Sequence, residues 1–297
     1  MNKKILSTFL KGFAMGSVDI VPGISGGTMA LILKIYSKII KEIKSIDIVF
    51  LKNILQFKFK KAFSLIDAPF LISLFIGIIT AIIALARIID WLLTNHPVYL
   101  YSFFFGLIII SAFLLIPKRN ISIKSITLLI VGFFIAAAIS FLSPANTPET
   151  YLFIFLSGAL AICAMILPGI SGAFVLLLLG KYEFMISVLK NPSSLENIII
   201  IIIFIFGCLV GLLSFSRFLN QLLKKHYHLT LMVLIGFMLG ALNKIWPFKK
   251  IILDSQGLIA QERNIIPSLS VELIYALALC LAGILIGYLL GKIKSKP

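Results

Sequence analysis

The chain has 297 residues, of which 60% are hydrophobic and only 13% are charged, and its formal net charge is +16. This composition excludes an ordinary soluble domain of that length. The lysines gather in loops and at the termini, while runs such as 70–86 carry no charge. That pattern is typical of topology signals in a membrane protein and does not indicate nucleic-acid binding. The runs do not alternate as barrel strands would, so we expect an all-α integral membrane protein.

The first expected element consists of two apolar arms, at about 5–20 and 28–43, separated by the sequence Pro-Gly-Ile-Ser-Gly at 22–26. Each arm is shorter than the roughly 20 residues that a spanning helix needs. Proline and glycine break the helix between them, and the freed backbone groups must lie against protein or in a watery cavity. We therefore predict a re-entrant hairpin, with a kinked continuous span as the alternative.

Three apolar spans follow a lysine-rich stretch at 41–68, and the second part of the chain then runs through the same series again. The expected spans are 70–92, 98–116 and 125–143, and later 197–219, 228–246 and 271–291. Long uncharged runs of this kind match the thickness of the hydrocarbon core.

An internal duplication is visible in the residues themselves. Residues 22–36 and 168–182 are identical at 8 of 15 positions, at an offset of 146. A second set of matches has an offset of 130 and pairs Gly77, Arg87, Leu92, Leu93, His96, Gly106 and Pro117 with Gly207, Arg217, Leu222, Leu223, His226, Gly236 and Pro247. We therefore predict two repeats, 1–143 and 144–297, each with one hairpin and three spans.

The distribution of lysines predicts the topology. With a basic N-terminus in the cytoplasm, the 41–68 stretch and the C-terminal Lys292, Lys294 and Lys296 also lie there, and the sparsely charged loop 143–150 lies outside. The loop 247–270 is assigned outside although it is basic. An odd number of spans in each half makes the repeats inverted, an arrangement typical of secondary transporters in a cytoplasmic membrane.

The two broken elements are candidate anion sites. Their glycines permit close approach of a ligand, their hydroxyls can cap the outgoing helix, and that helix begins with free N–H groups. Arginines at matching positions of the two halves could clamp a phosphate, or could instead snorkel to the interface. Close packing of helices is the alternative explanation for the glycines. The candidate phosphate-binding residues are Pro22, Gly23, Ser25, Gly26, Gly27, Thr28, Pro168, Gly169, Ser171, Gly172, Arg87 and Arg217.

Two acidic residues are candidates for coupling to protons or sodium. Asp19 lies within an apolar stretch three residues before Pro22, and an intramembrane carboxylate is costly unless it is used. Its alternative role is to stabilise the hairpin. Glu183 is the acid nearest to the second element, whose counterpart of Asp19 is Met165. No catalytic constellation, metal motif or cofactor motif is present, so we expect no enzyme, no metal site and no cofactor.

The strings GSVDIVPGISGGTMALILKIY and ILPGISGAFVLLLLGKYE resemble the bacterial polyprenyl-phosphate transporter family. The resemblance covers essentially the whole chain and implies that undecaprenyl phosphate is returned across the cytoplasmic membrane for envelope synthesis. Lys34 departs from the pattern, because a glycine is expected there and Gly180 keeps it in the second copy. A transporter or channel for small anions is the first alternative, and a membrane-embedded enzyme acting on lipid phosphates is the second. The residues do not specify the oligomeric state.

Overall fold

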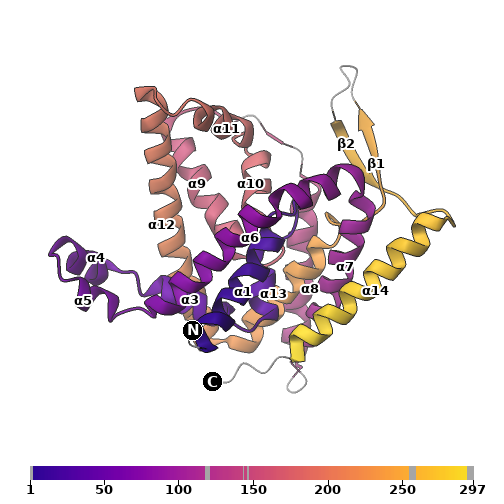
Figure 1. Ribbon diagram of the computed structural model, residues 1–297, viewed down its shortest axis with the longest axis horizontal. Coiled ribbons are helices and arrows are strands. Elements are labelled where there is room, and N and C mark those ends of the chain that lie inside the picture. The colour runs from indigo at the N-terminus through magenta and orange to yellow at the C-terminus, as the bar shows by residue number, and fades with distance from the viewer. Residues whose placement is uncertain (1–2, 118–120, 143, 146, 254–258, 293–297) are drawn as a thin grey trace.

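The computed structural model describes residues 3–117, 121–142, 144–145, 147–253 and 259–292 (Figure 1). Within these ranges the first half of the chain forms eight helices: α1 (Lys3–Asp19), α2 (Gly26–Ile32), α3 (Tyr36–Lys44), α4 (Ile48–Leu55), α5 (Phe59–Phe63), α6 (Ala68–Asn95), α7 (Pro97–Leu115) and α8 (Ile123–Ser140). The second half forms α9 (Tyr151–Ile166), α10 (Gly172–Leu178), α11 (Tyr182–Lys190), α12 (Leu195–Lys225), α13 (Tyr227–Ala241), β1 (Lys249–Leu253), β2 (Ile259–Asn264) and α14 (Val271–Lys292).

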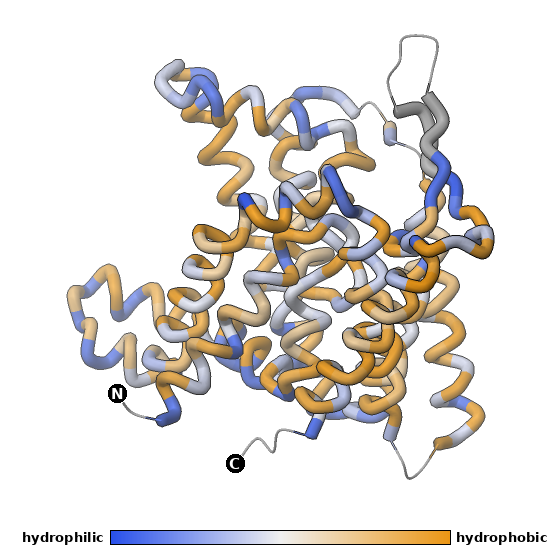
Figure 2. Tube along the Cα trace, turned by 45° about the vertical axis from the view of Figure 1, so that its right-hand side comes forward, coloured by the Kyte–Doolittle hydropathy of each residue, from blue (hydrophilic) through white to orange (hydrophobic). Residues whose placement is uncertain are grey.

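Five helices of the described chain are long and apolar enough to cross a membrane, namely α6, α7, α8, α12 and α14. The bent pair of α10 and α11 would make a sixth candidate if it counted as one span. The fifth expected span, 228–246, is shorter in the structure, because α13 has 15 residues and ends at Ala241. Figure 2 shows that the long helices are hydrophobic over most of their length and that polar residues gather toward the ends of the molecule.

Helices pack in four long pairs, and the pairs follow the duplication in the sequence. α1 lies along α6 as α9 lies along α12, while α8 lies along α13 and α14 along α7. Glycines permit these close approaches: a Cβ at Gly77 would collide with the Phe9 carbonyl, and one at Gly207 with the Phe155 carbonyl. Gly77 and Gly207 are matching positions at the offset of 130, so both halves use the same small residue at the same crossing.

The expected arms differ from the structure in one respect. The arm predicted at 28–43 is two helices, α2 and α3, with a break at 33–35, and the corresponding α10 and α11 meet at an angle of 103°. The breaks occur at matching residues, Lys34 with φ of 57° and Gly180 with φ of 66°. A residue in the left-handed backbone conformation ends the helix that precedes that residue.

The expectation of an all-α chain is corrected by a two-stranded antiparallel ribbon. β1 and β2 pair with Lys249 opposite Asn264 and Lys250 opposite Arg263, within the loop predicted at 247–270. Isoleucines at 251 and 252 favour a strand. The ribbon and α11 lie at one end of the molecule and the two termini at the other (Figure 1).

Three expectations fall on positions outside the described residues. Residue 143 was expected to end the third span and to mark the boundary between the halves, and Lys294 and Lys296 were assigned to the cytoplasm. The remaining elements place the two broken loops, 20–25 and 167–171, in the interior of the helical body, where the candidate site lies.

Candidate functional site

The first loop is held by hydrogen bonds of its serine. Ser25 is the N-cap of α2: its Oγ accepts a hydrogen bond from the Gly27 N–H at 3.1 Å and donates one to the Met165 carbonyl, also at 3.1 Å. The turn before it needs a left-handed residue, which Gly23 supplies with φ of 88°. Gly169 has φ of 82° in the second loop, so the two loops turn in the same way.

The two loops meet each other. The Thr28 Oγ1 accepts a hydrogen bond from the Gly169 N–H at 3.0 Å, and the buried Tyr36 hydroxyl donates one to the Ile166 carbonyl at 3.2 Å. At Gly27 an added Cβ would lie 2.7 Å from that same Ile166 carbonyl oxygen. Residues from the start of each half therefore form one contact region, although they are about 140 positions apart in sequence.

The N-terminus of α2 is already occupied by a carboxylate of the chain. Asp19 ends α1, and its Oδ1 accepts a hydrogen bond from the Gly26 N–H at 2.5 Å. The interpretation of Asp19 as a stabilising partner of the first loop is thus consistent with its contacts. In the second half, Ser171 caps α10 through the Phe174 N–H at 3.4 Å, and Met165 stands where a second carboxylate would be.

A cavity of about 150 Å³ lies between the loops. It brings together polar groups from both halves, including the Asp19 carboxylate and the Ser25 and Ser171 side chains, with the backbone at the start of α10. The lining residues are Asp19, Ile24, Ser25, Met165, Ile170, Ser171, Gly172 and Ala173.

An apolar groove of about 290 Å³ adjoins this cavity and shares Asp19 and Met165 with it. Its walls come from α1, α2, α3 and α6 of the first half and from α9 and α12 of the second. Apart from Asp19, two glycines and the hydroxyl of Tyr36, the lining consists of Met, Ala, Ile, Leu and Phe side chains. The two spaces together have a polar end and an apolar end.

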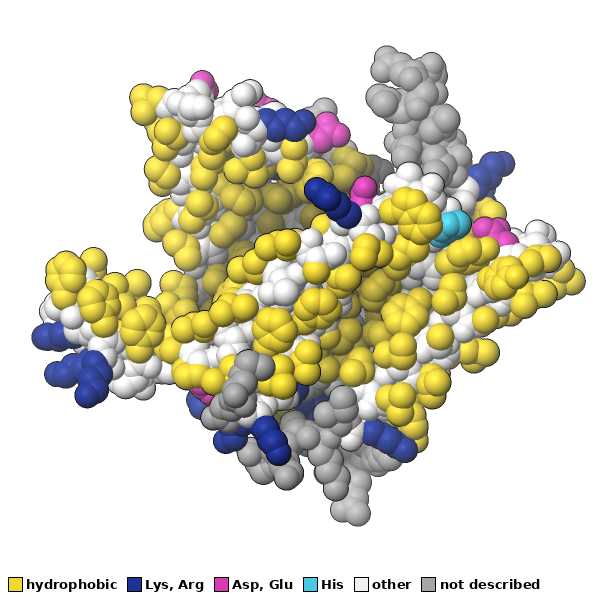
Figure 3. Space-filling model, viewed as in Figure 1, with side chains coloured by type: hydrophobic (Ala, Val, Ile, Leu, Met, Phe, Trp, Pro, Cys, Tyr) yellow, Lys and Arg dark blue, Asp and Glu magenta, His cyan; other side chains and the backbone are white. Residues whose placement is uncertain are grey.

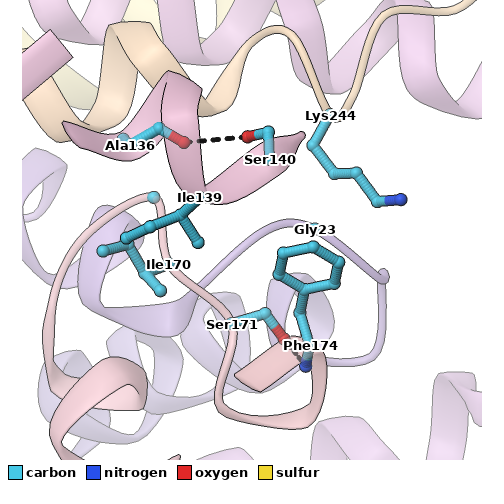
Figure 4. A pocket seen from close by; sticks show the side chains of 9 residues that line it. Gly23, Ala136, Ile139, Ser140, Ile170, Ser171, Phe174 and Lys244 are labelled. Atoms are coloured by element: carbon cyan, nitrogen blue, oxygen red, sulfur yellow. Dashed lines mark hydrogen bonds between the residues drawn. The ribbon is translucent and has the colours of Figure 1, made fainter. Parts of the chain in front are cut away.

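Sequence reasoning missed a lysine beside the loops. Lys244 follows α13 and lines a small hollow together with Gly23, Gly169, Ser171 and Phe174, with its Nζ 5.1 Å from the centre of the Phe174 ring (Figure 4). Ser171 lines both this hollow and the 150 Å³ cavity. The available signal was a lysine inside the expected span 228–246, since a charge within a span is a candidate functional residue.

Comparisons with known proteins identify the family of this chain. A family model described as undecaprenyl phosphate translocase-like matches residues 15–262. The chain belongs to the undecaprenyl phosphate translocase-like family. A polyprenyl-phosphate transporter of Vibrio cholerae serotype O1 is 45% identical over 82% of this chain and 79% of the relative. A polyprenyl-phosphate transporter of Staphylococcus aureus is 32% identical over 80% of this chain and 85% of the relative. No solved structure matches the chain.

Membership of the undecaprenyl phosphate translocase-like family confirms the resemblance found in the sequence, and with the five long apolar helices it makes this a multi-pass membrane protein. The family assignment does not identify site residues. Arg87, Arg217 and Glu183 are exposed and line neither the cavity nor the groove. Pro22 is exposed and Pro168 is buried in the second loop. Among the described residues, no group of three or more His, Cys, Asp or Glu side chains could hold a metal ion.

Proposed function

We propose that this protein carries polyprenyl phosphate across the bacterial cytoplasmic membrane and so returns the carrier lipid for envelope synthesis. The observation that supports this function best is the polar cavity between the loops with the apolar groove beside it. A lipid monophosphate has a charged head that needs polar partners and a chain that needs an apolar path. The printed names of both relatives point to the same substrate class.

The phosphate binds at the second-half side of the cavity. Asp19 already accepts from the N-terminus of α2, so the free anion-binding capacity lies at Ser171, Gly172 and Ala173. Backbone N–H groups and a serine hydroxyl are suitable donors for phosphate oxygens. Lys244 lines the adjoining hollow together with Ser171 and supplies a positive charge on that side of the serine. Arg87 and Arg217 remain candidates for an outer phosphate contact, on entry to or exit from the site.

Coupling to a cation follows from the charges in the cavity. A phosphate monoester carries roughly −1.5 to −2 charges near neutral pH, and the Asp19 carboxylate shares the same space. Two anions at close range in a poorly hydrated site repel each other strongly. A proton or a sodium ion at Asp19 removes this repulsion, so substrate and cation bind together. Glu183 is the second candidate for a coupling group.

The transport cycle uses the duplication. The two halves are inverted repeats, each loop ends a re-entrant element, and the termini lie in the cytoplasm. Matching glycines at matching helix crossings support the duplication, and the odd number of spans expected in each half would make the two repeats inverted. Rocking one half against the other then exposes the cavity to each leaflet in turn.

Proteoliposomes that contain a short-chain polyprenyl phosphate test the proposal. We expect wild-type protein to move the lipid between leaflets, and we expect Lys244→Gln and Ser171→Ala to slow this movement about tenfold or more, because each removes a phosphate partner in a desolvated site. The variants Arg87→Ala and Arg217→Ala determine whether the outer arginines contribute. If the wild type moves inorganic phosphate but not the lipid, the substrate is a small anion. Release of phosphate from the lipid would indicate an enzyme.

A further inference from the structure

A segment of the first half projects from the helical body and takes no part in the cavity. It comprises residues 46–66, with α4 and α5, and we call it the basic foot. In the second half the corresponding helices α11 and α12 are joined by residues 191–194 alone. The shorter connection shows that this fold does not need such a segment between these helices. The foot therefore needs an explanation of its own.

The basic foot exposes large apolar side chains that the protein leaves uncovered. Ile48 and Leu55 are each 79% exposed and Phe57 is 80% exposed. Other apolar members of the foot are also exposed, namely Val49, Leu51, Phe59, Phe63 and Leu65. So many exposed apolar groups on one small segment indicate a surface that an apolar environment covers.

The charge of the foot is predominantly positive. Its charged residues are Lys52, Lys58, Lys60 and Lys61 and one acid, Asp47, whose carboxylate caps α4 by accepting a hydrogen bond from the Phe50 N–H at 3.0 Å. Figure 3 shows that the hydrophobic side chains over α4 and α5 gather on one side and the lysines along the other. The lysine side faces the end of the molecule at which both termini lie (Figure 1).

This orientation fits the boundary of a bilayer. An interfacial helix sinks its apolar face into the acyl region and keeps its lysines at the level of the headgroups. In the foot, the apolar side is turned toward the middle of the molecule, where the long helices are hydrophobic, and the lysines are turned toward the polar end. The foot therefore changes from apolar to charged in the same direction as the spanning helices do, from the middle of the molecule toward its end.

We infer that the basic foot lies in one membrane interface and that its four lysines bind the headgroups of anionic lipids. The attraction of lysines to a negatively charged leaflet supplies the preference for anionic lipids, and the apolar side chains supply the depth of insertion. The foot also continues from α3, whose Ile39, Ile40 and Ile43 line the apolar groove, as does Ile46 of the foot itself. Negatively charged lipids are therefore concentrated beside the groove.

A fluorescent probe on the foot tests this inference. The full-length protein carries Leu55→Cys in a background with Cys163→Ala, Cys208→Ala and Cys280→Ala, is labelled with a polarity-sensitive dye, and is placed in nanodiscs. One set of discs contains phosphatidylcholine alone, and the other contains about one third phosphatidylglycerol. Acrylamide serves as the aqueous quencher, because it is uncharged and the surface potential does not change its local concentration.

We expect the quenching constant in the anionic discs to be at most about one third of that in the neutral discs. Replacing the four lysines of the foot by glutamine should abolish the difference, and replacing them by arginine should preserve it. The matched control is Lys124→Gln, Lys190→Gln, Lys224→Gln and Lys225→Gln, which removes the same charge from exposed positions elsewhere and should keep the difference. Equal quenching in both discs, or a difference that survives the glutamine changes in the foot, would overturn the inference.

Discussion

Asp19 and Met165 occupy matching positions in two loops that turn alike, yet only one of them is charged. Asp19 serves α2 as a hydrogen-bond acceptor and also faces the cavity, so it can stabilise the fold and act in transport at once. Lys244 gives the opposite asymmetry, because its counterpart at the offset of 130 is Leu114. The duplicated scaffold therefore carries one acid from the first half and one base from the second.

Substitutions of Asp19 separate its two roles. We expect Asp19→Asn to keep an oxygen for the Gly26 N–H and to lower the free energy of unfolding by less than about 1 kcal/mol. Asp19→Ala leaves that N–H without its acceptor and should cost about 1–3 kcal/mol. Thermal unfolding in detergent measures both. Transport by Asp19→Asn should no longer respond to a proton or sodium gradient, and a response equal to that of the wild type would exclude coupling at this residue.

Lys34 is a second informative residue, because it holds a left-handed conformation that Gly180 adopts without strain in the other half. We expect Lys34→Gly to stabilise the protein by roughly 0.5 kcal/mol, since relief of the backbone strain exceeds the added entropy of the unfolded glycine. The matched change Gly180→Ala should destabilise it by about 1 kcal/mol. Unfolding midpoints of the two variants give the comparison, and a loss of stability in Lys34→Gly would show that the bond from the Lys34 Nζ to the Gly291 carbonyl outweighs the strain.

At the scale of elements, paired helices depend on the glycines at their crossings. Gly77→Ala and Gly207→Ala place a Cβ against a backbone carbonyl, which cannot move aside as the end of a side chain can. We expect each to cost about 2 kcal/mol or more, through separation of α1 from α6 or of α9 from α12. Gly291→Ala is the control, because its new Cβ meets only the flexible side chain of Leu114. Equal unfolding temperatures for all three variants would contradict the packing account.

The start of α6 gives a prediction about pH. Asp67 caps the helix by accepting from the Phe70 N–H at 3.1 Å, and its carboxylate pairs with the Lys38 Nζ at 2.6 Å. The hydrogen bond from Lys38 holds the pKa of Asp67 below its usual range. A carboxyl whose pKa is depressed in the folded state stabilises the protein above its unfolded pKa, near about 4, and this contribution is lost as the pH falls below that value.

We therefore expect the stability difference between wild type and Asp67→Asn to shrink as the pH falls through about 4. The pair is exposed, so the difference at neutral pH should be at most about 1 kcal/mol. Asp67→Ala also removes the cap and should cost about 1 kcal/mol more at every pH. Unfolding midpoints measured across this pH range test the prediction. A stability difference between wild type and Asp67→Asn that does not change with pH would show that the ion pair does not contribute.

Several elements could be predicted from the sequence because one strong signal decides them. Long uncharged runs predicted α6, α7, α8, α12 and α14, and proline with glycine predicted the breaks at 22–23 and 168–169. The break at Lys34 was not predicted, since lysine is an ordinary helix residue and only the neighbouring structure forces its conformation. The ribbon at 249–264 was missed because a short pair of strands has a weak hydrophobic pattern.

In the candidate site, too, some residues could be predicted from the sequence and others could not. Asp19, Ser25, Ser171 and Gly172 were singled out by their motif, and the structure brings them to one cavity. The pairing of Ser25 with the Met165 carbonyl could not be predicted, because it joins residues 140 positions apart and depends on how the halves dock. Lys244 was overlooked although its charge within the expected span 228–246 was a signal for it. The arginines were selected by their match alone, and a match between repeats does not show where a side chain lies.

At the scale of the whole molecule, the two halves contribute unlike chemistry to one shared space. The first half supplies the carboxylate and most of the apolar groove, and the second supplies the start of α10 and the neighbouring lysine. A substrate that fits both spaces must touch both halves, so relative movement of the halves changes its surroundings. Under the proposed function, this arrangement suits a substrate with one charged end and one apolar end.

Photo-crosslinking of a lipid substrate tests this central claim most directly. A short polyprenyl phosphate with a diazirine in its chain is activated in proteoliposomes, and the modified peptides are identified by mass spectrometry. We predict labels on groove residues of α1, α3 and α9, such as Met15, Ile39 and Ile162, which unlabelled polyprenyl phosphate suppresses and the corresponding polyprenol does not. Labels that polyprenol suppresses equally, or that fall only on the outer surface of α14, would contradict a phosphate-directed site between the two loops.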